Sequence, residues 1–438
     1  MGILTQILGF LLSLAILVIL HESGHFVLAK LFKTRVEKFY LFFNPWFSIF
    51  KFKKGQTEYG LGWLPLGGYV KISGMIDESL DKEQMKKPPQ PWEFRSKPIW
   101  QRLFIMLGGV LVNFILALFI YAILLFTWGK VYLPAENVKY GVICDSLALE
   151  IGMKNGDKVL KVDTFKIKEL RDIPFHILLD DAKSITVERN GEIIIIPIPE
   201  DFGKRMLENN VISLVTPIYP MVIDSLLPGK PAEKAGILKN DRIWAINEIE
   251  TPSAYGFSKL IPTYKGKEIE LLIERNKSRK KIKVKVNEEG IIGVFSKPFT
   301  DFLETKTIKY GFIESFPAGI ALGVNRLKDY VRQFKIIFTK EGVKHIGGFG
   351  TIGSLFPKTW NWAQFWEMTA FLSLIFAFMN VLPIPALDGG HVVFLLYEMV
   401  AGKKPGDKFL EYAQITGMMI LFALLIYANG NDILKLFK

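Results

Sequence analysis

The chain has 438 residues, which is long for a single hydrophobic core and predicts two or more domains. Hydrophobic residues make up 50% of it and the mean hydropathy is +0.25, so bilayer-spanning segments are the first class to consider. The net charge of +12 is not gathered into an aromatic-rich basic domain, which argues against nucleic acid as a partner, and the single cysteine, Cys144, excludes an intrachain disulfide and a zinc–thiolate cluster.

Residues 3–29 are predicted to form a first spanning helix with a polar motif near one end. No Lys or Arg precedes Lys30, and the apolar run 3–20 leads directly into His21-Glu22-Ser23-Gly24-His25. A signal peptide would begin with positive charge and end at a small-residue cleavage site, so a retained helix is favoured. The basic loop 30–100 is placed in the cytoplasm and the N-terminus outside.

The stretch from Tyr59 to Gly74 is apolar but too rich in glycine for a helix, and it predicts a β-hairpin or a looped sheet with exposed backbone. At membrane depth such a segment is tolerated only where it lines a protein cavity. Residues 103–127 form a second predicted span, in which Gly108, Gly109 and Asn113 indicate close helix packing more than chemistry.

Residues 133–300 contain charged residues, alternating strand patterns and turn sequences, which predict a water-soluble region, and they include an internal repeat. The two copies lie 84 residues apart, and the matching positions are Ala148, Gly152, Asp157, Val162 and Asp163 in the first and Ala232, Gly236, Asp241, Ile246 and Asn247 in the second. An amphipathic helix is expected over 306–340, and two further spans over 365–382 and 412–428. Four spans place the soluble region on the same side as the N-terminus.

The pattern His-Glu-x-x-His at residues 21–25 predicts a metal site. On a helix, His21 and His25 share one face, where two neutral imidazoles can bind one Zn²⁺ while Glu22 polarises a water molecule. Two surface histidines on a soluble helix would be the plain alternative. Their place at the end of an apolar span, where ionisable groups are costly, favours a functional site.

Zinc in a catalytic site needs a third protein ligand, and Asp388 is the candidate. It follows Pro383 and Pro385, which end the third span, and precedes two glycines. The alternatives are Asp388 as a helix N-cap and His391 as the third ligand. Asn380 either hydrogen-bonds a substrate carbonyl or satisfies freed backbone groups, whereas His176 and His345 are predicted to be structural.

The two separated motifs, His21-Glu22-x-x-His25-Phe26 and Asn380-x-x-Pro383-x-Pro385-x-Leu387-Asp388-Gly389-Gly390-His391, resemble those of the site-2 protease family of intramembrane metalloproteases. The branch that the chain resembles is the bacterial regulator of sigma-E protease, with tandem PDZ domains in place of the repeats and a membrane re-entrant β-element in place of residues 57–75. The chain departs from the family where Val110 replaces a proline after Gly109 and where Gly347-Gly348-Phe349-Gly350 replaces Gly-Pro-Ile.

The resemblance implies a multi-pass α-helical membrane protein of about four spans. Its parts would be a first membrane part (1–130), two PDZ-like α+β domains (133–215 and 216–300) and a second membrane part (301–438). It also implies a bacterial inner-membrane location, with the PDZ-like domains periplasmic and the active site toward the cytoplasm. Zinc would be bound by His21, His25 and Asp388, with Glu22 as general base.

The implied substrates are single-span membrane proteins in the lipid bilayer, above all an anti-sigma factor already cut by another protease, and also remnant signal peptides. A substrate helix must unwind before cleavage, and the exposed edge of the predicted hairpin offers it strand pairing. The substrate-contacting residues would then be Asn380, Gly62, Gly67, Gly68, Tyr69, Val70 and Lys71. The competing interpretations are a membrane-anchored PDZ binding protein with a structural zinc site, which leaves Glu22 without a task, and a transporter, which four spans and a large repeat disfavour.

Overall fold

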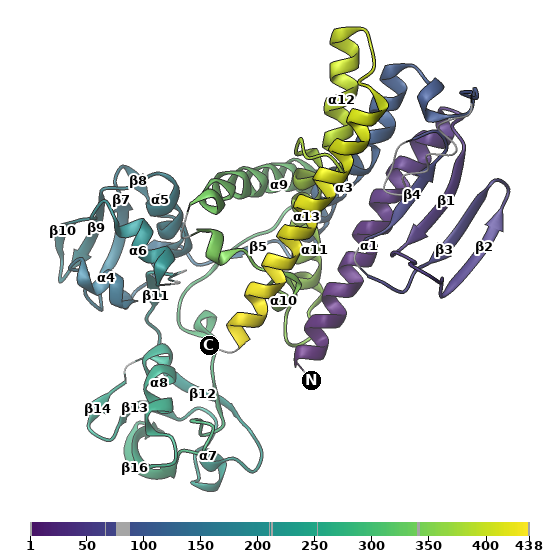
Figure 1. Cartoon of the computed structure of the whole chain (residues 1–438). Helices are drawn as coiled ribbons and strands as arrows, with labels where there is room; N and C mark the ends of the chain where they lie inside the picture. Colours follow the sequence, from purple (N-terminus) through teal and green to yellow (C-terminus); the bar gives the residue numbers. More distant parts are fainter. Residues whose placement is uncertain are drawn as a thin grey trace. The chain divides into compact units, whose positions relative to one another are not determined.

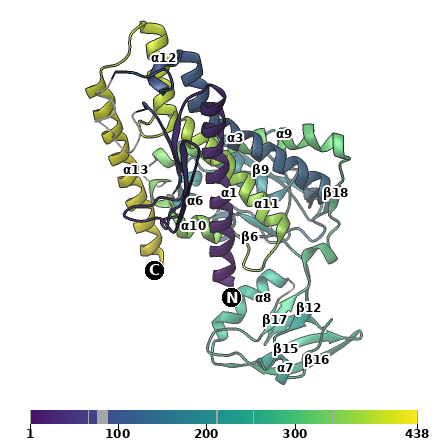
Figure 2. The same ribbon diagram turned by 90° about the vertical axis from the view of Figure 1, so that its right-hand side faces the viewer.

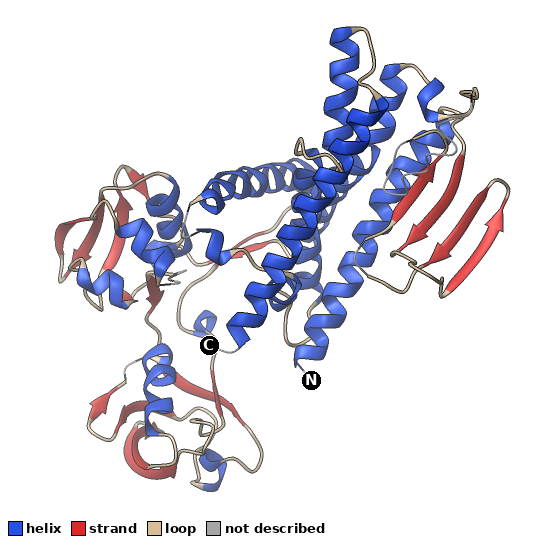
Figure 3. Ribbon diagram, viewed as in Figure 1, coloured by secondary structure: helices blue, strands red, loops and turns tan. Residues whose placement is uncertain are grey.

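The computed structural model describes residues 2–65, 67–75, 88–209, 211, 213–251, 253–339 and 342–436. Leu66, within the predicted β-element, and residues 76–87, within the predicted cytoplasmic loop, lie outside the described residues. The chain divides into two compact units, Met1–Gly129 with Lys309–Lys438, and Lys130–Ile308 (Figure 1). The first unit holds the long helices and one sheet, and the second holds the remaining strands (Figure 3).

Four helices of the first unit are long and apolar enough to cross a membrane: α1 (Gly2–Leu31), α3 (Ile99–Thr127), α11 (Trp362–Val381) and α13 (Asp407–Leu436). They coincide with the four predicted spans, so that prediction is confirmed. Each is built on a long, mainly apolar stretch, and a chain in lipid must satisfy its backbone hydrogen bonds within the helix. The start of α11 is fixed by Asn361, whose side chain accepts a hydrogen bond of 3.0 Å from Gln364 N.

Helix α3 is the centre of the first unit, since it packs against both α1 and α11 (Figure 2). It also contacts α9 (Phe312–Phe334) and α12 (Asp388–Ala401), while the short α10 (Phe349–Ser354) contacts α1 and α13. The predicted amphipathic helix over 306–340 is confirmed for Phe312–Phe334 only. Residues Lys306–Ile308 form strand β18 instead, because they pair with β5 (Lys130–Tyr132) of the second unit.

One mixed sheet lies beside α1 in the first unit (Figure 1). Its strands are β1 (Val36–Leu41), β2 (Phe50–Lys54), β3 (Thr57–Leu61) and β4 (Tyr69–Ile72), in the order β2-β3-β1-β4. The predicted hairpin over 59–74 is therefore wrong and the alternative of a looped sheet is right. Strand β1 lies between β3 and β4 and pairs parallel with the first and antiparallel with the second. The buried side chains of Val36 and Tyr40 anchor β1 in that central place.

The second unit builds two separate hydrophobic cores, one from residues between Ala135 and Val215 and one from residues between Met221 and Ile292. The first is formed by β6 (Val142–Cys144), β7 (Lys158–Val162), β8 (Phe165–Lys166), β9 (Ser184–Arg189), β10 (Glu192–Pro197), β11 (Val215–Pro217), α4 (Ser146–Glu150), α5 (Ile173–Leu179) and α6 (Phe202–Glu208). The second is formed by β12 (Met221–Leu226), β13 (Arg242–Ile246), β14 (Ile249–Glu250), β15 (Glu268–Arg275), β16 (Ser278–Lys285), β17 (Val294–Ser296), α7 (Pro231–Lys234) and α8 (Ala254–Leu260). The description of these two parts as PDZ-like stays a prediction.

The sequence repeat reappears as a repeated ion pair. Asp157 accepts hydrogen bonds of 2.7 and 2.8 Å from Arg189, whose Nη2 also donates to Gly152 O. In the second copy, Asp241 accepts bonds of 2.8 and 2.6 Å from Arg275, which likewise donates to the carbonyl of a glycine, Gly236. Each buried carboxylate also accepts a backbone N–H three residues before it. The repeated aspartates therefore stabilise the two cores.

Candidate metal centre

Helix α1 brings two imidazoles together near its C-terminal end. His21 and His25 are one turn apart, with 3.2 Å between their Nε2 atoms. His25 Nδ1 lies 2.8 Å from the carbonyl oxygen of Ile105 on α3. A proton on Nδ1 donated to that carbonyl leaves Nε2 of His25 with a lone pair for a metal ion.

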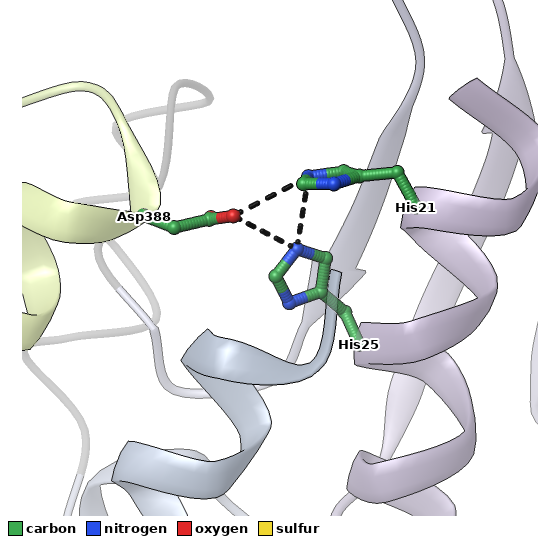
Figure 4. Close-up of side chains that lie close together, drawn as sticks. All are labelled: His21, His25 and Asp388. Carbon is green, nitrogen blue, oxygen red and sulfur yellow. Dashed lines mark hydrogen bonds and ion pairs between the residues drawn. The ribbon is translucent and has the colours of Figure 1, made fainter. Parts of the chain in front are cut away.

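The segment between α11 and α12 supplies a carboxylate to the same point. Helix α11 ends at Val381, Pro383 and Pro385 keep the chain out of helical conformation, and α12 begins at Asp388. The alternative that Asp388 is an N-cap is wrong, because the cap position belongs to Leu387. Asp388 Oδ2 instead lies 3.3 Å from Nε2 of each histidine (Figure 4).

The three donor atoms fit a zinc ion. Their separations of 3.2, 3.3 and 3.3 Å form a nearly equilateral triangle. Tetrahedral zinc with bonds of about 2.0–2.1 Å to nitrogen and oxygen holds neighbouring ligand atoms about 3.3 Å apart. Asp388 Oδ2 is buried and has no hydrogen-bond partner among the residues that the structure describes, as expected of an oxygen directed at a cation. Three protein donors leave the fourth position open.

His391 is not a member of this group of candidate ligands, which in the described part of the chain consists of His21, His25 and Asp388. His176 fits its predicted structural role, since its Nδ1 lies 2.8 Å from Asp180 and its ring stacks on Phe165. His345 ends a short 3-10 helix, Gly342–His345.

Glu22 is partly buried on α1 between the two histidines in sequence, and the sheet approaches it closely. A side chain at Gly68 would have its Cβ 3.4 Å from Glu22 Cγ and 2.7 Å from a methyl group of Val18. Because Gly68 has no side chain, the segment that leads into β4 can lie directly against α1 at Glu22.

The other predicted substrate-contacting residues fall in two places. Tyr69, Val70 and Lys71 belong to β4, at the end of the sheet, and Gly62, Gly67 and Gly68 belong to the connection that precedes it. Asn380 lies in the last turn of α11, half-buried and eight residues before Asp388. Their contact with a substrate stays a prediction.

Two features of the site were missed at the level of sequence. Asn113 on α3, for which the sequence indicated close helix packing more than chemistry, has its Nδ2 3.3 Å from Nδ1 of His21. Arg102 on α3 forms a bidentate ion pair with Glu398 on α12, with hydrogen bonds of 2.9 and 2.7 Å. This pair joins α12, the helix that begins at Asp388, to α3. The sequence did not indicate these contacts, because the partners are far apart along the chain.

The sequence is similar to a known peptidase family and to named bacterial metalloproteases. The profile of the family described as Peptidase family M50 matches residues 9–424. The chain is 28% identical over 467 residues to the regulator of sigma E protease of Haemophilus influenzae, with all of both chains covered. It is 26% identical to the metalloprotease MmpA of Caulobacter vibrioides, covering 99% of this chain and 96% of that one. It is 28% identical to the "Putative zinc metalloprotease RC0203" of Rickettsia conorii, covering 99% of each.

Proposed function

The chain belongs to peptidase family M50, the site-2 protease family, and on that premise we propose that it is a zinc protease that cleaves single-span membrane proteins within or near their spanning segment. The observation that carries this proposal is the triangle of donor atoms from His21, His25 and Asp388, with Glu22 beside it. These are the residues that the two family motifs contribute.

In this proposal the two histidines and Asp388 hold zinc, and Glu22 is the general base. A zinc ion bound there would polarise the scissile carbonyl and lower the pKa of a water molecule at its open position toward about 7. Glu22 would take the proton of the attacking water and pass it to the leaving amine.

Strand β4 is the proposed docking edge for the substrate. It pairs with β1 on one side only and ends the sheet in the described part of the chain. The close approach of Gly68, which directly precedes β4, to Glu22 supports this proposal, since a Cβ at Gly68 would be 3.4 Å from Glu22 Cγ. A spanning helix that unwinds there would exchange its internal hydrogen bonds for strand bonds, with Asn380 as a further contact to a substrate carbonyl.

The proposed substrates are anti-sigma-factor-like proteins that another protease has shortened, and remnant signal peptides. The relative from H. influenzae, named regulator of sigma E protease, supports the first class. We further propose a bacterial inner-membrane location with unit 130–308 outside the cytoplasm, where two PDZ-like domains would exclude substrates with bulky external parts. The excess of Lys and Arg in loop 30–100 supports that orientation.

The test is cleavage of a tagged single-span substrate in cells by the intact chain, Glu22→Gln and Asp388→Asn. We expect cleavage by the intact chain and its loss in both variants at equal protein level, since one lacks the base and the other weakens the metal site. Cleavage that persists in Glu22→Gln would mean that another enzyme cuts. If the intact chain binds zinc but cuts no substrate offered, a membrane-anchored PDZ binding protein with structural zinc becomes the better description.

A further inference from the structure

Helix α3 presents three residues to the two imidazoles, spaced one turn apart: Ile105, Gly109 and Asn113. The spacing of four puts them on one face, as it does for the histidines on α1. The carbonyl of Ile105 lies at His25 Nδ1, and the side-chain amide of Asn113 lies at His21 Nδ1. Gly109 faces both rings, since a Cβ built there would be 2.4 Å from His25 Nε2 and 2.7 Å from His21 Nδ1.

A histidine that binds a metal through Nε2 carries its proton on Nδ1 and needs an acceptor for it. His25 has the carbonyl of Ile105 in that role. For His21, the group recorded at Nδ1 within the described part of the chain is the Asn113 amide. One of its two polar atoms must therefore meet the ring nitrogen.

The amide nitrogen faces the ring in the structure, at 3.3 Å, while Asn113 Oδ1 is buried without a hydrogen-bond partner among the described residues. In that orientation Nδ2 donates to Nδ1 and the imidazole proton would occupy Nε2, where the metal must bind. A half-turn about the Cβ–Cγ bond exchanges Nδ2 and Oδ1. Oδ1 then accepts a hydrogen bond from the protonated Nδ1 of His21. This rotation moves only the amide group; the backbone carbonyl of Asn113, which accepts a hydrogen bond of 2.7 Å from Ser373 Oγ, stays in place.

We propose that Asn113 Oδ1 accepts the Nδ1 proton of His21 and is a positioning residue that makes Nε2 of this histidine available to the metal. The inference rests on the proposed function, because it assigns a task beside the same metal centre. It explains why a fully buried amide stands in an otherwise apolar span, where an unmatched polar group is costly.

The test measures zinc affinity by competition with a chelator, on the full-length protein in detergent, for the intact chain and two variants of similar side-chain size. Asn113→Leu removes the acceptor and is expected to raise the Kd for zinc by about 10–100-fold, as loss of a partner behind a ligating histidine does. Asn113→Asp keeps an acceptor and is expected to bind zinc at least as tightly as the intact chain. The visible spectrum of Co²⁺ in the site should change in the leucine variant and be preserved in the aspartate variant.

Ser373→Ala is the matched control, because it disturbs the packing at Asn113 without touching its amide. Its zinc Kd should stay within a few-fold of the intact value. Zinc binding by Asn113→Leu equal to that of the intact chain would overturn the inference, and so would an aspartate variant as weak as the leucine variant, which would point to a donor or a packing role. The aspartate result decides alone if the leucine variant does not fold. If the intact chain shows no zinc binding that His21→Ala abolishes, the proposed function itself fails and the inference with it.

Discussion

Replacing Gly109 by alanine is expected to disable the metal centre while leaving the membrane fold intact. The added Cβ would lie 2.4 Å from His25 Nε2, 2.5 Å from His21 Cε1 and 2.7 Å from His21 Nδ1. All three are atoms of the imidazoles that supply two corners of the donor triangle. The steric conflict therefore falls on the ligands themselves.

The magnitude follows from these distances. Ordinary carbon contacts begin at about 3.5 Å, so at least one ring must retreat by about 1 Å. A displacement of that size costs about 100-fold in rate when reacting groups must be aligned, and a weakened ligand set costs about 10–100-fold in metal affinity. The backbone does not oppose the change, because alanine is about 1 kcal/mol better than glycine inside a helix.

The assay is cleavage of a single-span substrate in membranes, together with zinc content after purification. Gly430→Ala is the matched control, since it makes the same exchange in spanning helix α13 with no described atom within 4 Å of the new Cβ. We expect about 100-fold slower cleavage and reduced zinc for Gly109→Ala, and normal values for the control. Normal cleavage and zinc content in Gly109→Ala would refute the geometry assigned to the two rings.

Three further predictions concern the supports of the site and the soluble unit. Removing one charge of the Arg102–Glu398 pair, whose side chains are 7% and 13% exposed, should cost about 3–5 kcal/mol of stability, and the two single losses should not add in the double variant; additive losses in a denaturation cycle would contradict a direct pair. Burial alone would raise the pKa of Asp157, but hydrogen bonds from Arg189 outweigh this effect and hold the pKa below its usual value. The ion pair therefore stabilises the fold above about pH 4, and this stabilisation is lost as the pH falls further. The melting temperatures of the intact chain and Asp157→Asn should converge in acid, and a constant difference down to about pH 2 would disprove the assignment. Val70→Pro should slow cleavage while zinc stays bound, because it removes a backbone donor from the edge of β4, and undiminished cleavage would rule out docking along this edge.

Local patterns were sufficient for much of the fold. The spans follow from apolar runs, and the pair of histidines follows from a spacing of four on one of them. The repeated Asp157 and Asp241 also marked equivalent positions correctly, but their partners Arg189 and Arg275 are two residues out of the register of that repeat, so the matched positions do not include them. The internal repeat was enough to locate the two aspartates, although it did not show which side chains they bind.

Strand pairing was harder, because it depends on segments that carry no shared signal. The stretch 59–74 contains two strands with a glycine-rich connection, which predicts a hairpin when it is considered alone. Strand β1 comes from residues before that stretch and pairs with both. The sheet order thus follows from the burial of β1 side chains against α1, a tertiary contact that alternation within 59–74 does not contain.

The contribution of α3 to the metal centre escaped prediction for a different reason. A soluble helix reveals its inward face by amphipathic periodicity, but a spanning helix is apolar on every side and gives no such signal. Its few small or polar residues are then the remaining guide to the face that meets other helices. In α3, Gly109 and Asn113 are four residues apart, the same interval as His21 and His25, and the structure sets these two pairs against each other. In a spanning helix, the spacing of the few small and polar residues therefore indicates the packed face, as amphipathic periodicity does in a soluble helix. In α3 this spacing marks the face that meets the two histidines of the metal centre, and not a packing face alone.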